Sequence, residues 1–307
     1  MPIIYDPPGV YGGTESLNGL VEEILSVLQG FTADSDMVTS LTADITADAT
    51  TFVVDDASGL SSGVVEIGDE LVWVRSVDTT SGTVQTLPSG RGWRGTQAVA
   101  HSAGELVSIS PTVPRSAIVR EINNTIRAIY PSLFAVTTTQ FTYNDNTKLA
   151  WDIPAEAEAV LDVRWRNQYG NWETAKTWSV VNSLNLTDHT TGTALRLQGV
   201  PVGYDVQVVY GRKPSVLTSV TQDWTDCGLT DGAKDLLVLG AITRLLPALD
   251  VSRLSVVYAA ADELDQPRPL GSALSIAKQY RQDYLTRLAE ERDVLNRRYP
   301  ARWHRSV

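Results

Sequence analysis

The chain has 307 residues, a net charge of -11 and a single cysteine, Cys227. This length allows a sizeable core, divided between two or three units. The lone cysteine excludes an intrachain disulfide, and the sequence has neither an apolar run long enough to span a membrane nor a segment resembling a secretory signal. These features predict a protein made in the cytoplasm without a membrane partner.

The charge is distributed unevenly along the chain. Residues 1–113 carry fifteen acidic and three basic side chains, whereas residues 271–307 carry eight basic and four acidic ones. Affinity for nucleic-acid phosphates comes from lysine and arginine. The acidic first part of the chain therefore argues against a protein that grips DNA.

Residues 14–29 predict an amphipathic helix, because leucine, valine and isoleucine recur on one face. Thr14 or Ser16 can cap its start and Gly30 can end it. Residues 38–109 then change to short runs rich in valine, threonine and aromatic residues, separated by turn residues. This pattern predicts a small β-module.

A second amphipathic helix is predicted at 114–130, where Pro114 suits the first turn and Pro131 ends the helix. Residues 136–212 return to short β-runs with glycine, asparagine and aspartate turns. Their spacing is typical of a β-sandwich.

Three helical segments follow the second β-block, at 231–249, 252–264 and 271–299. The first is apolar nearly all round, which predicts the most buried helix of the chain. The last is long and carries leucines and tyrosines on roughly one stripe.

This order predicts an α+β fold with a helical core, formed by the N-terminal helix, the central apolar helix and the long C-terminal helix. A small β-module and a β-sandwich-like domain are inserted into it, because single helices could not bury their apolar faces alone. Separate domains strung along the chain are the alternative. The predicted parts are an N-terminal arm and helix (1–37), the β-module (38–113), a core helix (114–135), the second β-domain (136–213), the helical core (214–299) and a basic, aromatic tail (300–307).

No catalytic or metal-binding set can be assembled from these residues. His101, His189 and His304 have no partner at a metal-ligand spacing, so each is interpreted as structural or surface. Cys227 has no neighbouring histidine to activate it. We therefore predict no enzyme activity, no catalytic residues, no metal and no cofactor.

Two acidic pairs and a group of tryptophans have structural interpretations. Asp55-Asp56 and Asp69-Glu70 lack the alternating ligands of a calcium loop, so a turn and a solvated strand edge are favoured. The tryptophans of the second β-block could form a sugar-binding platform, but packing in a core or interface is the favoured interpretation. They are Trp151, Trp165, Trp172 and Trp178.

Three short motifs stand in order in the first β-block: IGDE at 67–70, RGWRGT at 91–96 and HSAG at 101–104. Arg91 and Arg94 are expected to pair with carboxylates of the same module, which favours a stable β-fold without a site. The order resembles a small β-module that recurs in virion proteins of tailed bacteriophages, at the head-tail connector and in tail tips and fibres.

The helical segments at 117–134 and 231–249, with the long last helix, resemble head-tail connector (adaptor) proteins of tailed phages. The resemblance implies a structural virion protein at the head-tail interface. Copies would form a ring, commonly twelve-fold, below the portal ring and dock the next connector, a tail terminator or a tail protein. Packaged DNA would pass through the channel without sequence-specific binding.

The C-terminal segment is the sharpest candidate binding site, because arginine and aromatic residues are enriched in binding hot spots. We predict that it docks on the portal; a frayed, solvated terminus is the other interpretation. The candidate residues are Arg297, Arg298, Tyr299, Arg302, Trp303 and Arg305.

A tail-tip, baseplate or fibre protein that binds a host surface is the second functional interpretation. The tryptophan-rich block would then be the binding domain. A fibre is expected to end in β-structure or a trimeric coil, whereas this sequence ends in a predicted helix and a basic segment.

Overall fold

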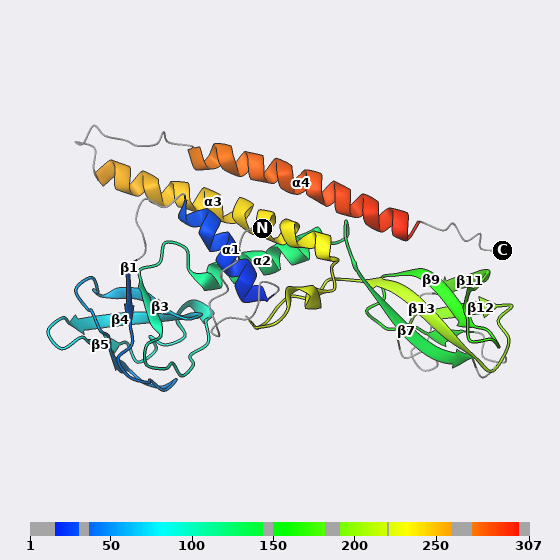
Figure 1. The fold of residues 1–307 in the computed structure, drawn as a ribbon, viewed down its shortest axis with the longest axis horizontal. Helices are drawn as coiled ribbons and strands as arrows, with labels where there is room; N and C mark the ends of the chain where they lie inside the picture. Colours follow the sequence, from blue (N-terminus) through cyan, green and yellow to red (C-terminus); the bar gives the residue numbers. More distant parts are fainter. Residues whose placement is uncertain are drawn as a thin grey trace, which may run out of the picture. The chain divides into compact units, whose positions relative to one another are not determined.

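The computed structural model describes residues 16–30, 37–143, 150–181, 191–219, 221–259 and 272–300, without the side chains of 250–259 and 272–274. The chain forms two compact units (Figure 1). The first contains residues 1–124 and 238–281, and the second contains residues 125–237 and 282–307.

The first unit contains a six-stranded antiparallel sheet with the strand order β1-β6-β3-β4-β5-β2. Its strands are β1 (Met37–Ser40), β2 (Thr51–Val53), β3 (Gly63–Ile67), β4 (Glu70–Asp78), β5 (Thr83–Thr86) and β6 (Leu106–Ile109). A bridge between Leu41 and Val54 joins the two outer strands. There the Thr42 N–H donates to the Val53 carbonyl at 3.0 Å, so the sheet closes into a small barrel.

The barrel has an apolar core of its own. Every second residue of a strand points inward, and here those positions hold mainly valine and isoleucine. Burying each such side chain contributes roughly 1.5–3 kcal/mol. The core residues are Leu41, Ile45, Phe52, Val54, Ala57, Leu60, Val65, Ile67, Val72, Val74, Val84 and Val107.

Two amphipathic helices accompany the barrel, close to the ranges predicted from their periodicity. In α1 (Leu17–Gln29) the first turn is capped by Ser16, whose Oγ accepts the Gly19 N–H at 3.2 Å. In α2 (Arg115–Ile129) the isoleucines on one face are fully buried.

The second unit contains a β-sandwich made of two antiparallel sheets. The strand order is β10-β9-β13-β7 in one sheet and β11-β12-β8 in the other, and their side chains share one core. The strands are β7 (Ala135–Tyr143), β8 (Trp151–Asp152), β9 (Ala159–Arg166), β10 (Trp172–Thr174), β11 (Thr177–Val181), β12 (Ala194–Gln198) and β13 (Tyr204–Arg212).

The last part of the chain is helical. The short helices η2 (Trp224–Cys227) and η3 (Asp231–Ala233) are followed by α3 (Lys234–Ala259) and α4 (Ser272–Arg298). Another short helix, η1 (Trp93–Gly95), lies between β5 and β6 of the barrel. The segment predicted to be most buried, 231–249, lies mainly in α3, and most of its leucines are buried. The predicted break between 249 and 252 is absent: α3 is one continuous helix, and it contains Pro247.

The prediction of an α+β fold built on a helical connector core is wrong. The described residues form thirteen strands in three antiparallel sheets and only four α-helices, so the fold is β-rich. The physical reason is that barrel and sandwich each enclose an apolar core. Neither β-block therefore depends on a helical core to bury its side chains. The six-part division of the chain stays a prediction.

Candidate functional site

The three motifs of the first β-block meet at one buried carboxylate, that of Glu70. Its Oε1 accepts from Arg91 Nε at 2.7 Å and from the Gly92 N–H at 2.9 Å. Its Oε2 accepts from Arg91 Nη2 at 2.9 Å and from the Val99 N–H at 3.1 Å, and lies 3.0 Å from His101 Nε2. IGDE thus supplies the carboxylate, and RGWRGT and HSAG supply its partners.

Arg91 and His101 have their remaining polar atoms occupied as well. Arg91 Nη1 donates to the carbonyls of Thr46 and Ala49, at 2.7 and 3.1 Å. His101 Nδ1 lies 2.9 Å from Glu105 Oε1. The network joins the strand β4, the RGWRGT loop and the loop before β2. Both carboxylate oxygens of Glu70 are occupied by these protein partners.

The charges of this network stabilise one another. Burial raises the pKa of Glu70, but hydrogen bonds from Arg91, His101 and two backbone N–H groups outweigh it and lower the pKa to about 2. Burial lowers the pKa of His101, but its contacts with Glu70 and Glu105 outweigh this and raise the pKa above its usual value.

The network confirms part of the sequence interpretation and corrects another part. Arg91 pairs with a carboxylate as predicted, and His101 is structural. Arg94 is exposed and has a positive φ of 54°. The prediction that Glu70 lies on a solvated strand edge is wrong, since only 1% of it is exposed.

A second charged group joins the barrel to α1 and to the start of α2. Glu66 Oε1, on β3, accepts the Arg115 N–H at 2.8 Å. The Arg115 guanidinium contacts Glu22 Oε1 at 2.5 Å and Asp69 Oδ1 at 3.2 Å, and it also donates to Asn18. Burial raises the pKa of Glu66 to about 7, although the N–H and charge of Arg115 act in the opposite direction.

Of the other candidates for chemistry, Cys227 lies among the described residues, whereas His189 and His304 lie outside them. Within the described ranges, no three histidine, cysteine or acidic side chains could hold a metal ion. Cys227 is buried, and burial raises the pKa of its thiol, which disfavours the reactive thiolate. None of the helices in the part of the chain that the structure describes is long and apolar enough to cross a membrane.

The tryptophans of the sandwich form no aromatic platform. Trp151 and Trp178 belong to the core, and the Trp151 ring lies 4.3 Å from that of Tyr143. Trp165 packs edge-on against Tyr204. Trp172, at 39% exposed, is the most exposed of the four. Core packing, the favoured interpretation, describes most of this group.

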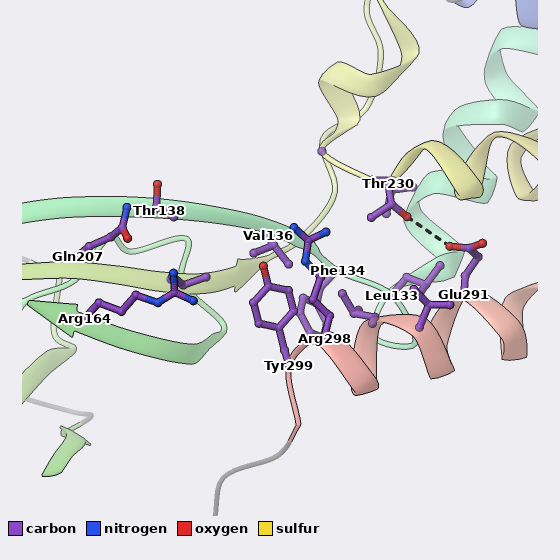
Figure 2. Close-up of a pocket in the computed structure, with 15 residues that line it drawn as sticks. Leu133, Phe134, Val136, Thr138, Arg164, Gln207, Thr230, Glu291, Arg298 and Tyr299 are labelled. Atoms are coloured by element: carbon purple, nitrogen blue, oxygen red, sulfur yellow. Dashed lines mark hydrogen bonds between the residues drawn. The ribbon is translucent and has the colours of Figure 1, made fainter. Parts of the chain in front are cut away.

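The second unit contains a cavity of about 520 Å³ between its four-stranded sheet and the last turns of α4 (Figure 2). Its sheet side is the face opposite the sandwich core: Gln207 lines the cavity, while its neighbours Val206 and Val208 face the core. Arg298 and Tyr299 extend toward this face from the end of α4.

The cavity includes part of the predicted C-terminal binding site. Arg298 and Tyr299 line it, and the Arg298 guanidinium carbon lies 5.7 Å from the centre of the Tyr299 ring. Arg297 is exposed and does not line the cavity. The other predicted residues, Arg302, Trp303 and Arg305, lie outside the described residues.

Sequence reasoning missed the strand side of this cavity. Arg164, on β9, adds a second guanidinium, whose Nε donates to Asp162 at 2.8 Å. Alternation within β9 could have placed Arg164 opposite the core-facing Val163. No sequence signal pairs that strand face with α4.

Comparisons with known proteins identify no family for this chain. No protein-family model matches it, and no curated protein matches it. Among solved structures, it is similar to the regulatory subunit of a cAMP-independent protein kinase A from Trypanosoma brucei, with 11% identity over 90% of this chain and 98% of the other. The TM-score is 0.14, which carries no argument about fold or function.

Proposed function

We propose that this chain is a structural protein of a tailed-phage virion, located at the head-tail connector. The observation that supports it best is the Glu70 network, because the three motifs that carry the resemblance to phage virion modules meet there. They form one internally satisfied unit of a small barrel. Such an internally paired arrangement supports a structural role.

In this proposal copies of the chain assemble into a ring below the portal, commonly twelve-fold in the family that the sequence resembles. Heterologous contacts close such a ring. The β-rich fold replaces the helical core first expected, so the barrel and sandwich would be the bulk of each subunit. The ring would extend the DNA channel and dock the next connector or the tail.

The charge distribution suits a channel through which DNA slides. The first 113 residues have fifteen acidic and only three basic side chains. Arg91 is one of the three, and its guanidinium is paired with the Glu70 carboxylate. A channel wall holds DNA in place only where lysine or arginine is available to bind its phosphates. A wall formed by this part of the chain would therefore let the DNA slide.

The test is assembly with the portal. The full-length protein is mixed with portal rings of the same phage and imaged by negative-stain electron microscopy. We expect an added ring on one end of the portal. A protein that neither forms a ring nor joins the portal would refute the proposal, and binding of the full chain to host cells instead would favour a tail-tip role.

A further inference from the structure

Strand β7 is an unusually open edge of the sandwich. It pairs with β13 along all nine of its residues without a register shift, and no described strand pairs with its other edge. Its sequence, AVTTTQFTY, has no charged residue and no proline. Proteins commonly shorten, bulge or charge their edge strands to prevent pairing with other chains. β7 has none of these protections.

The cavity of the second unit lies beside this edge. Val136 and Thr138 of β7 line it, so a strand added next to β7 would direct every second side chain toward the same face. Such a combination of backbone pairing and side-chain pockets is how added peptide strands are recognised.

The lining indicates what kind of segment fits. Val209, Leu229 and Leu295 form apolar walls. Arg164 and Arg298 bring two positive charges, and Arg164 already has Asp162 as a partner. Glu291 also lines the cavity, but its carboxylate is paired with Arg287 at 3.2 Å. The site therefore suits an extended segment with apolar side chains and one carboxylate.

We propose that residues 2–6 of a second copy of this chain pair with the free edge of β7, with an apolar side chain in the cavity and Asp6 near Arg298. The segment reads PIIYD, and isoleucine and tyrosine favour strands. Asp6 is the only charged side chain among residues 1–14, and its charge is opposite to that of Arg298. Pro7 and Pro8 follow, and since proline cannot donate a hydrogen bond, the added strand ends there.

This contact is heterologous, because a segment preceding α1 in one copy would bind the second unit of the next. Repeated around an axis, it closes a ring. The inference rests on the self-assembly proposed above and names one of its contacts.

Peptide binding tests the contact without any need for ring formation. A fluorescein-labelled peptide of residues 1–11 is titrated with the full chain and with a chain lacking residues 2–6, in which a neighbour's segment cannot compete. We expect saturable binding by fluorescence anisotropy, tighter to the deleted chain. An Asp6→Arg peptide should bind roughly fivefold more weakly, and the Arg298→Asp chain should recover that loss.

Two controls separate the specific contact from general attraction. Arg297→Asp changes the same charge on the same turn of α4 but lies outside the cavity, so peptide affinity should stay unchanged. Two peptides are methylated on a backbone nitrogen, one at Ile4 and the other at Tyr5. Only one of them should bind more weakly, because alternate N–H groups of a strand face the neighbouring strand.

Absence of saturable binding, or equal effects of Arg297→Asp and Arg298→Asp, would overturn this inference. Deletion of residues 2–6 should also lower the sedimentation coefficient of the self-associated protein. An unchanged coefficient would overturn the inference, because it would mean that the segment does not join one copy to the next. Rings that form on the portal without this peptide contact would leave the proposed function standing.

Discussion

The carboxylate of Glu66 on β3 accepts the backbone N–H of Arg115 at 2.8 Å, so a side chain of the barrel caps the first turn of α2. Glu66 is 5% exposed, and its carboxylate interacts with the charge of Asp69. A cap of this kind ties the barrel to the helix, and its strength depends on the protonation state of one buried group.

Glu66 is expected to make the stability of the protein fall as the pH rises. Its pKa is about 7 in the folded chain and 4.5 as the ordinary value, so the folded state binds the proton more tightly. This contribution is fully present below pH 4.5 and is lost as the pH rises through about 7, with a size of about 3 kcal/mol. Glu66→Gln keeps the acceptor oxygen and should flatten that loss, measured by urea unfolding at pH 5 and pH 8. Parallel pH profiles of the two proteins would contradict this, and exposed Glu23→Gln is the control.

Arg91→Ala should destabilise the protein by about 3–5 kcal/mol, because it leaves the buried Glu70 carboxylate without its main partner. Arg94→Ala, in the same motif, removes an exposed side chain and should cost less than about 0.5 kcal/mol. Urea unfolding followed by tryptophan fluorescence measures both. Equal losses would show that the network does not hold the loop.

His101 should stabilise the barrel most in its charged form. Its pKa is raised, so its contribution is fully present below its ordinary value of 6.5 and is lost as the pH rises through the higher folded value. His101→Gln should therefore cost more stability at pH 6 than at pH 9. The histidine ring shifts in an NMR titration give the folded pKa directly, and a value below 6.5 would refute this account.

Trp151→Ala should destabilise the sandwich by about 3–5 kcal/mol, because the ring belongs to its core. Trp172→Ala should change stability by less than about 1 kcal/mol, since this ring is 39% exposed. Thermal unfolding by calorimetry separates the two. If the sandwich bound sugars through a tryptophan platform, the exposed position would matter for glycan binding while stability stayed unchanged.

Truncation after Asn296 should abolish co-assembly with the portal, because it removes all six predicted docking residues. Truncation after Pro300 leaves Arg298 and Tyr299 at the cavity and removes Arg302, Trp303 and Arg305. It should weaken co-assembly by the part of the portal binding that these three residues contribute. Co-sedimentation with portal rings measures both truncations. Portal binding that survives truncation after Asn296 would refute a docking role for this segment.

Local periodicity predicted several elements well. The helix expected at 14–29 is found at Leu17–Gln29, and that expected at 114–130 is found at Arg115–Ile129. Both β-blocks are also present. These elements depend on contacts a few residues apart, which a pattern of apolar side chains records.

The architecture and the sites depend on contacts that no local pattern records. Closure of the barrel needs Leu41 beside Val54, and the cavity needs a strand face beside the end of α4. Glu70 shows the same limit: its neighbours in the sequence indicated a solvated strand edge, yet its partners are Arg91 and His101.

The sequence by itself thus determined the amphipathic helices, the two β-blocks, the acidic first part and the pairing of Arg91 with a carboxylate of its own module. Only the tertiary structure decided that the fold is β-rich and which carboxylate Arg91 and His101 share. The physical reason is that burial and charge pairing are settled between distant segments, where apolar surface and compensating charges meet.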